Sequence, residues 1–65
     1  MTIVYTAYDA AAPQDSDAHD GYPLTAQTDI GARRQARKLA REKGFADLRI
    51  TFRRESDGCC GAISV

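Results

Sequence analysis

The sequence predicts a single small α+β domain in which an antiparallel sheet of about four strands carries one helix on one face, in the order ββαββ. Two short stretches of alternating residues precede an alanine-rich amphipathic segment, and two more follow it. The 65 residues suffice for one domain only, which we place at residues 1–65. Hydrophobic residues make up 43% and charged residues 28%, as in ordinary globular proteins, so the chain should fold.

The N-terminal part predicts a hairpin of two strands around a long acidic loop. Residues 2–8 are mostly β-branched or aromatic and nearly alternate, which indicates the first strand. Residues 9–21 contain a proline, a glycine and four aspartates without apolar periodicity, which indicates a loop. Residues 22–27 alternate again, and Pro23 places this short second strand at a sheet edge or at a strand start.

A helix is predicted at residues 29–43. Thr28 and Asp29 are both favoured at a helix N-terminus, and Gly44 suits the position after its C-terminus. Alanines and one leucine share a narrow face at the helical repeat, whereas four cations lie on the opposite side. Small side chains on the narrow face should let the helix approach the sheet closely, and Phe45 should pack back on the last turn.

The third and fourth strands are predicted as a C-terminal hairpin over residues 47–65. Residues 48–53 alternate apolar and polar side chains, and Asp57-Gly58 is a strong signal for a two-residue turn. The pairs expected from that turn are Phe52 with Ile63, Ile50 with Val65 and Arg54 with Gly61. Apolar residues then face apolar residues, so turn chemistry and hydrophobic pattern agree.

Apolar positions that face inward on the strands and the helix should share one core. The predicted core residues are Ile3, Tyr5, Ala7, Tyr22, Leu24, Ala26, Ala36, Leu39, Phe45, Leu48, Ile50, Phe52, Ile63 and Val65. The other sheet face should remain open to water, as is common in antiparallel sheets. The residues predicted there are Thr6, Tyr8, Thr25, Gln27, Arg49, Thr51, Arg53 and Ser64. The sequence leaves the strand order open, and one order consistent with it places the C-terminal strand beside the first.

Charge is segregated along the chain, although nine basic and nine acidic residues cancel in sum. Residues 1–29 hold five aspartates and no Lys or Arg, whereas residues 30–54 hold nine cations and two carboxylates. A neutral protein with this layout has a large dipole, which can steer charged partners. Alternatively, the acidic loop and the basic helix neutralise each other across the surface.

No catalytic, metal or cofactor motif is present, so we expect neither an enzyme nor a bound metal or cofactor. Cys59 and Cys60 are adjacent, so on a strand they point to opposite faces and cannot ligate one metal; we expect free thiols. The aspartate-rich run that starts at Asp15 fails as a calcium loop, because its sixth position is Asp20 and its twelfth is Ala26.

Two charged surfaces remain as candidate binding sites. The preferred partner-binding residues are Asp15, Asp17 and Asp20, which could imitate a phosphate backbone in a basic groove of a larger protein or ribonucleoprotein complex. The alternative is a small nucleic-acid-binding regulator that uses the basic face of the helix. Its residues are Arg33, Arg34, Arg37, Lys38 and Arg41. A neutral total charge with a pI near 6.5 argues against this alternative.

The whole chain resembles small phage-encoded anti-CRISPR proteins, particularly those that act on type I systems. The features that it shares with them are one compact sheet, a basic helix at residues 29–43 and a terminal hairpin at residues 47–65. The resemblance rests on size, architecture and charge layout. It implies a non-enzymatic inhibitor that binds the crRNA-guided surveillance complex, Cascade, and blocks the engagement of target DNA in the host-cell cytoplasm. Because such proteins share neither one fold nor one interface, no functional residue is carried over by position.

No apolar run approaches the roughly 18 residues of a membrane span, so we expect a cytoplasmic protein without a membrane partner. We expect a monomer that binds a protein or ribonucleoprotein partner, with direct nucleic-acid binding as the second choice. A third interpretation is a homodimer that forms through an exposed edge strand.

Overall fold

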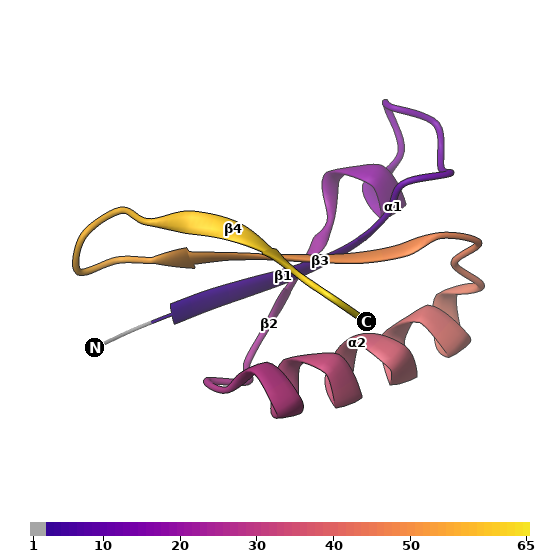
Figure 1. Ribbon diagram of the computed structural model, residues 1–65. Coiled ribbons are helices and arrows are strands. Elements are labelled where there is room, and N and C mark those ends of the chain that lie inside the picture. The colour runs from indigo at the N-terminus through magenta and orange to yellow at the C-terminus, as the bar shows by residue number, and fades with distance from the viewer. Residues whose placement is uncertain (1–2) are drawn as a thin grey trace.

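The computed structural model describes residues 3–65 and shows a four-stranded antiparallel sheet between two helices of unequal length (Figure 1). In chain order the elements are β1 (Ile3–Asp9), α1 (Asp17–Asp20), β2 (Tyr22–Leu24), α2 (Asp29–Lys43), β3 (Leu48–Arg54) and β4 (Cys60–Ile63). α2 covers one face of the sheet, and α1 lies on the other side. The predicted α+β class is confirmed, and Thr2 of the predicted first strand lies outside the described residues.

The strand order is β2-β1-β3-β4, so an order with the C-terminal strand beside the first is wrong. β1 pairs along its whole length with β3, from Ile3 opposite Arg54 to Asp9 opposite Leu48. Both strands have seven residues, whereas β4 has four. Pairing the two long strands at the centre satisfies the most backbone groups inside the sheet and leaves β4 at one edge. At the other edge lies β2 with Pro23, as predicted.

The β3–β4 hairpin turns through four residues and not through the predicted two. The N–H of Arg54 donates to the carbonyl of Cys59 over 2.7 Å, which leaves residues 55–58 in the loop. A two-residue type I′ turn needs positive φ at both central residues, but within the described chain only glycines have it, among them Gly58 with φ 70°. The Asp57 carboxylate instead accepts a hydrogen bond from the N–H of Cys59 over 3.0 Å and closes the longer loop.

The longer loop shifts the pairing of β3 and β4 by two residues. Ile50 lies opposite Ile63 and Phe52 lies opposite Gly61, so the predicted pairs of these strands are wrong. An even shift keeps every side chain on its predicted face, because strand side chains alternate with a period of two. Val65 now lies beyond the strand with 48% of its surface exposed, so its predicted place in the core is also wrong.

The core lies between the sheet and α2. Its buried apolar residues are Tyr5, Ala7, Leu24, Ala32, Ala36 and Ile50, with Ile3, Ala26, Leu39, Leu48, Phe52 and Ile63 packed around them. Ala32 and Ala36 are completely buried, and their small side chains let α2 lie close to the sheet. Tyr22 and Phe45, also predicted for the core, are half-buried and stack at its margin with ring centroids 6.1 Å apart.

α2 begins and ends where the sequence predicts. The Thr28 hydroxyl accepts a hydrogen bond from the N–H of Gly31 over 3.1 Å and caps the N-terminus. Gly44 follows the C-terminus, and the N–H of Phe45 donates to the carbonyl of Ala40 over 2.9 Å. These bonds satisfy backbone groups that a helix end leaves free, and the predicted helix at residues 29–43 is confirmed.

β2 is shorter than predicted, because the Gln35 side chain bonds the backbone N–H groups that follow it. The Gln35 Oε1 atom accepts hydrogen bonds from the N–H of Thr25 over 3.2 Å and of Ala26 over 3.1 Å. The Gln27 amide donates to the carbonyl of Ile3 over 3.0 Å and extends the contact with β1. Thr25 and Gln27 therefore lie outside the strand, and their predicted place on the open sheet face is wrong.

The predicted acidic loop at residues 9–21 contains a one-turn helix, α1. Ser16 caps this helix by accepting a hydrogen bond from the N–H of His19 over 3.3 Å, and its hydroxyl donates to the carbonyl of Pro13 over 2.7 Å. Gly21 ends the helix with φ 101° and ψ 163°, a conformation that is essentially restricted to glycine. The order of this segment therefore comes from short-range hydrogen bonds and one glycine.

Candidate functional site: two oppositely charged surfaces

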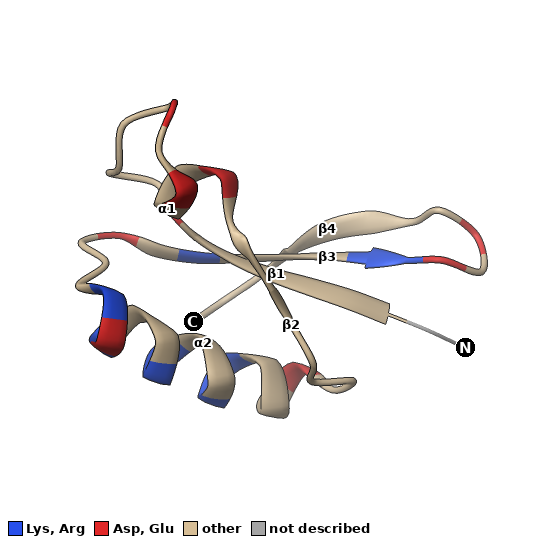
Figure 2. Ribbon diagram, turned by 180° about the vertical axis from the view of Figure 1, so that it is seen from behind, with Lys and Arg blue, Asp and Glu red and all other residues tan. Residues whose placement is uncertain are grey.

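Five cations of α2 line one hollow on the surface of the helix, and Figure 2 marks the positions of Lys and Arg along its ribbon. They are Arg33, Arg34, Arg37, Lys38 and Arg41, and we call them the basic surface. Together with Ile30 they line one shallow hollow of ≈ 510 Å³. Ile30 is 68% exposed, so the surface presents an apolar side chain among its cations. The structure therefore brings together all five residues of the basic helix face that the sequence predicts.

Hydrogen bonds connect α2, which carries the basic surface, to β1 and to the chain after β4. The hydroxyl of Tyr5, which is buried in the core, donates to Asp29 Oδ1 over 2.6 Å and ties the first turn of α2 to β1. This bond, together with burial, raises the pKa of Tyr5 above its usual value, so the phenol remains a donor at neutral pH. Arg33 Nε donates to the Ser64 carbonyl over 2.7 Å and ties α2 to the chain after β4.

The basic surface lacks acidic partners within residues 3–65. The ion pair in this part of the chain joins Arg49 Nε with Asp47 Oδ1 at 3.2 Å, away from α2, and no carboxylate lies within ion-pair distance of the basic surface. Like charges on neighbouring turns of a helix repel each other. A bound anion would relieve this repulsion, so the surface is suited to a negatively charged ligand.

The three aspartates that the sequence favours lie on the other side of the sheet, on and just before α1 (Figure 2). Asp15, Asp17 and Asp20, which we call the acidic surface, are all exposed. His19 packs against Tyr8 of β1 with ring centroids 6.3 Å apart, and this contact helps to hold α1 on the sheet. Because the sheet separates the two surfaces and no ion pair joins them among the described residues, they do not neutralise each other by direct contact.

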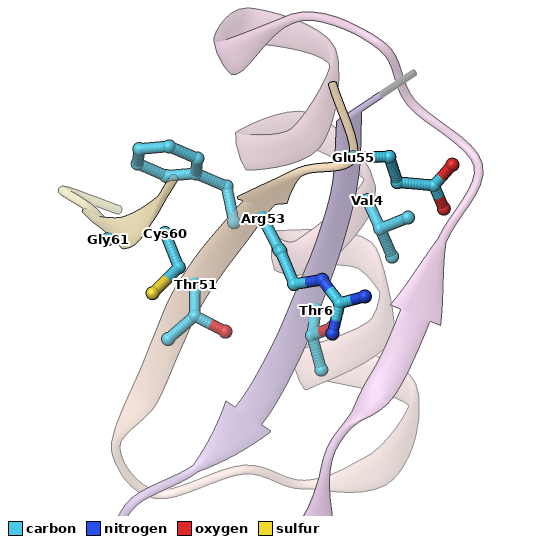
Figure 3. A pocket seen from close by; sticks show the side chains of 8 residues that line it. Val4, Thr6, Thr51, Arg53, Glu55, Cys60 and Gly61 are labelled. Atoms are coloured by element: carbon cyan, nitrogen blue, oxygen red, sulfur yellow. The ribbon is translucent and has the colours of Figure 1, made fainter. Parts of the chain in front are cut away.

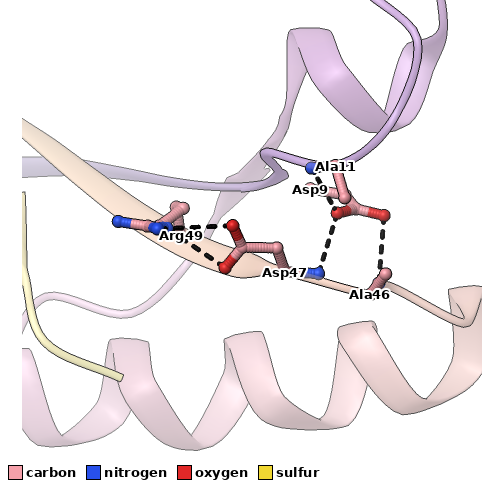
Figure 4. Close-up of polar contacts among 5 residues, drawn as sticks. All are labelled: Asp9, Ala11, Ala46, Asp47 and Arg49. Carbon is pink, nitrogen blue, oxygen red and sulfur yellow. Dashed lines mark hydrogen bonds and ion pairs between the residues drawn. The ribbon is translucent and has the colours of Figure 1, made fainter.

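A further aspartate, Asp9, is buried and is not among the site residues predicted from the sequence (Figure 4). Its carboxylate accepts hydrogen bonds from the N–H of Asp47 over 2.9 Å, of Ala11 over 3.0 Å and of Ala46 over 3.1 Å. These bonds, that of Ala46 most of all, lower the pKa of Asp9 below its usual range. Asp9 thus joins the end of β1 to the start of β3. The signal that points to it is an aspartate at the end of an apolar strand, where its side chain can bond the following turn.

The open sheet face carries another shallow hollow, of ≈ 600 Å³, which extends to β4 (Figure 3). Its lining includes Val4, Thr6, Thr51, Arg53, Glu55 and Cys60. Cys59 and Cys60 are exposed free thiols, and the described residues contain no group of three His, Cys, Asp or Glu side chains placed to hold a metal ion. The hollow combines one cation and one carboxylate with the Phe52 ring and smaller side chains, and its open shape offers mainly weak contacts.

Comparison with known proteins assigns the chain to no family. No family model matches the chain, and neither a curated protein nor a solved structure is significantly similar to it. Within residues 3–65, no helix combines the length and the apolar character that a membrane crossing requires. Function is therefore inferred from the geometry and charge of the two surfaces.

Proposed function

We propose that the chain is a small non-enzymatic binding protein that docks through its basic surface on the phosphate backbone of nucleic acid. One observation carries this proposal: five cations share one face of a well-anchored helix and have no carboxylate partner within the described residues. Phosphate groups are the complement of such a surface, because Lys and Arg neutralise them and release condensed counterions.

The neutral total charge does not oppose such binding. The acidic surface lies across the sheet from α2, and exposed charges separated by more than about 8 Å are largely screened at physiological salt. Beyond its first turn α2 itself carries a single carboxylate, Glu42. A phosphate backbone that approaches α2 therefore interacts mainly with the five cations.

Fluorescence anisotropy with a labelled DNA duplex of about two helical turns tests the proposal over a range of salt concentrations. The logarithm of the affinity should fall linearly with the logarithm of the salt concentration, with a slope of about −0.9 for each phosphate contacted. Arg37→Gln combined with Arg41→Gln removes two cations and should make this slope shallower by about 2.

The matched control is Arg49→Gln combined with Arg53→Gln, which removes two exposed arginines from the sheet instead of the helix. This variant has the same total charge as the helix variant, and it should bind the duplex as the wild type does. Equal weakening by both variants would show that total charge, and not the basic surface, attracts the DNA. A wild-type protein that does not bind the duplex at low salt would contradict the proposal.

A second candidate function is favoured by the exposure of Asp15, Asp17 and Asp20 on an ordered, hydrogen-bonded segment. In this proposal the acidic surface occupies a basic, nucleic-acid-binding groove of a larger complex. The type I Cascade complex is the partner that the resemblance to anti-CRISPR proteins implies, and the outcome is a block on the engagement of target DNA.

Charge reversal separates the two candidates. The second candidate predicts that Asp15→Lys, Asp17→Lys and Asp20→Lys together abolish the capture of purified type I Cascade. Under it, the combination of Arg34→Glu, Arg37→Glu and Arg41→Glu leaves that capture intact. Capture that survives reversal of the aspartates but not of the arginines would reject the acidic surface as the contact.

A further inference from the structure

The two edges of the sheet differ in how they are protected against pairing with another chain. At one edge β2 has three residues with Pro23 in the middle, so it is short and lacks one N–H donor. At the other edge, the stretch that contains β4, residues 59–65, has neither a charged residue nor a proline. Soluble proteins usually place such residues at exposed edges, because an unprotected edge pairs readily with another strand. β4 is thus an edge that is open to strand pairing.

The backbone groups that β4 offers at this edge follow from its pairing with β3. Arg54 and Cys59 share a backbone hydrogen bond, so the alternation of the ladder directs the groups of Gly61 toward β3 as well. The N–H and C=O groups of Cys60 and Ala62 consequently point away from the sheet. They form a short row of donors and acceptors that a further strand can bond.

Apolar side chains beside β4 are left partly uncovered. α2 packs mainly against β1, β2 and β3, so its layer does not extend fully over β4. Phe52 and Ile63 on the helix side are half-buried, and Val65 is 48% exposed. A Cβ atom at Gly61 would lie 3.0 Å from Cε1 of Phe52, so the ring covers this glycine and reaches toward the edge of the sheet.

We propose that a second copy of this chain pairs with β4 in antiparallel orientation, with the twofold axis at Gly61. Cys60 of each copy then lies opposite Ala62 of the other, and each of these pairs exchanges two backbone hydrogen bonds. The two Phe52 rings meet over the glycines at the axis, so aromatic surface that one chain leaves half-exposed becomes buried.

Charge complementarity favours a second copy over an unrelated strand. In this antiparallel register the loop of one copy, residues 55–58, extends beside Ser64 of the other. The loop carries Glu55 and Asp57, and Arg33 reaches Ser64 through its hydrogen bond of 2.7 Å. Each loop therefore brings its carboxylates to the Arg33 guanidinium of the other copy, and the twofold axis repeats the contact.

The pairing determines the architecture of the dimer. A twofold axis perpendicular to the sheet joins two four-stranded sheets edge to edge and keeps α2 of both copies on the same face. The two basic surfaces then face one side of the dimer. This inference departs from the sequence-based expectation of a monomer, and it does not depend on nucleic-acid binding.

Sedimentation velocity of the purified chain up to about millimolar concentration tests the pairing, and the wild type should shift toward the mass of two chains as concentration rises. Ala62→Pro should be monomeric throughout, because proline removes an N–H that points away from β3. Ala62→Ser keeps that N–H and should dimerise as the wild type does. An unchanged circular dichroism spectrum shows that the proline variant is folded. A wild type that stays monomeric at the highest concentration overturns the proposal.

Disulfide cross-linking tests the register independently. In a Cys59→Ser background, Ala62→Cys places a thiol opposite Cys60 of the other copy, at a Cα separation of about 5.5 Å that suits a disulfide. Oxidised glutathione, which is reduced as it takes up the two thiol hydrogens of each new bond, should convert this variant to a covalent dimer. Ser64→Cys in the same background is the matched control and should stay uncross-linked, because it faces Gly58 of the other copy. Equal cross-linking of both variants, or of neither, overturns the register.

Discussion

The basic and the acidic surface have opposite charges, and they also differ in how the fold holds them in place. α2 buries Ala32 and Ala36 against the sheet, so the cations it carries depend on tertiary packing. α1 is a single turn without a buried residue, so its aspartates depend on a serine cap and one glycine. Segments with few buried contacts open at low free energy, whereas packed helices do not. The comparison indicates that the basic surface is the better preorganised of the two for binding.

Gly21→Ala should have the largest effect, and it should act on the support of the acidic surface. The backbone at Gly21 has a glycine-restricted conformation, and an added Cβ would lie 2.6 Å from Thr6 Cγ2. Strain and overpacking together should lower the free energy of unfolding by about 2–4 kcal/mol. Urea denaturation followed by circular dichroism measures this loss.

Gly58→Ala is the matched control, because Gly58 also has positive φ but has open space around its Cβ position. This substitution should lower the free energy of unfolding by only about 1–2 kcal/mol. Equal losses in the two variants would mean that the added methyl group at Gly21 is not crowded by Thr6, and that the acidic segment does not lie closely against the sheet at this point.

Ala36→Leu is the corresponding change under the basic surface. Ala36 is completely buried between α2 and the sheet, so a larger side chain must push the helix outward. We expect the free energy of unfolding to fall by about 1–3 kcal/mol. Arg37→Leu, at the next and exposed position, should change it by about 0.5 kcal/mol or less. Amide chemical shifts should change along α2 but not in α1. The opposite pattern would contradict the inference that packing under α2 supports only the basic surface.

Removal of the helix caps should have smaller and unequal effects. Thr28→Ala removes the acceptor for the N–H of Gly31 and should lower the free energy of unfolding by about 1 kcal/mol. Ser16→Ala should lower it by about 0.5 kcal/mol, because the helix it caps is a single turn without a buried residue. Thermal melts of both variants under identical conditions provide the comparison. A larger loss from Ser16→Ala would reverse the order of stability inferred for the two helices.

Acid should weaken the hydrogen bonds of the Asp9 carboxylate at the start of the acidic segment, and this change should be negligible near neutral pH. Its hydrogen bonds keep the pKa of Asp9 in the folded chain below the unfolded value of about 3.9. The stabilisation is therefore complete above the unfolded pKa and is lost as the pH falls through the folded pKa. At pH values below about 4 the melting temperature should therefore decrease, and Asp9→Asn should make the melting temperature depend less on pH. Asp15→Asn, the exposed control, should retain the wild-type profile, and an unaltered profile for Asp9→Asn would refute the anchor.

Local rules were sufficient to predict the long helix and the faces of the strands. α2 runs over residues 29–43 because Thr28 and Gly44 act on the backbone within a few positions of themselves. Alternation assigned Phe52 and Ile63 to the same face of the sheet, although their direct pairing was wrong. The five cations of the basic surface likewise share one side of α2 because of the helical repeat.

Partners distant in sequence decided what local rules left open. The hydrogen bonds of Asp9 with residues 46–47 and of Gln35 with residues 25–26 form only when separate segments come together. The predicted two-residue turn was wrong for a local reason, because Asp57 does not adopt positive φ and its carboxylate instead bonds the N–H of Cys59. The sequence by itself determined that acidic and basic residues occupy separate segments. Only the tertiary structure put them on opposite sides of one sheet, because the order of charges along a chain does not specify which face each segment covers.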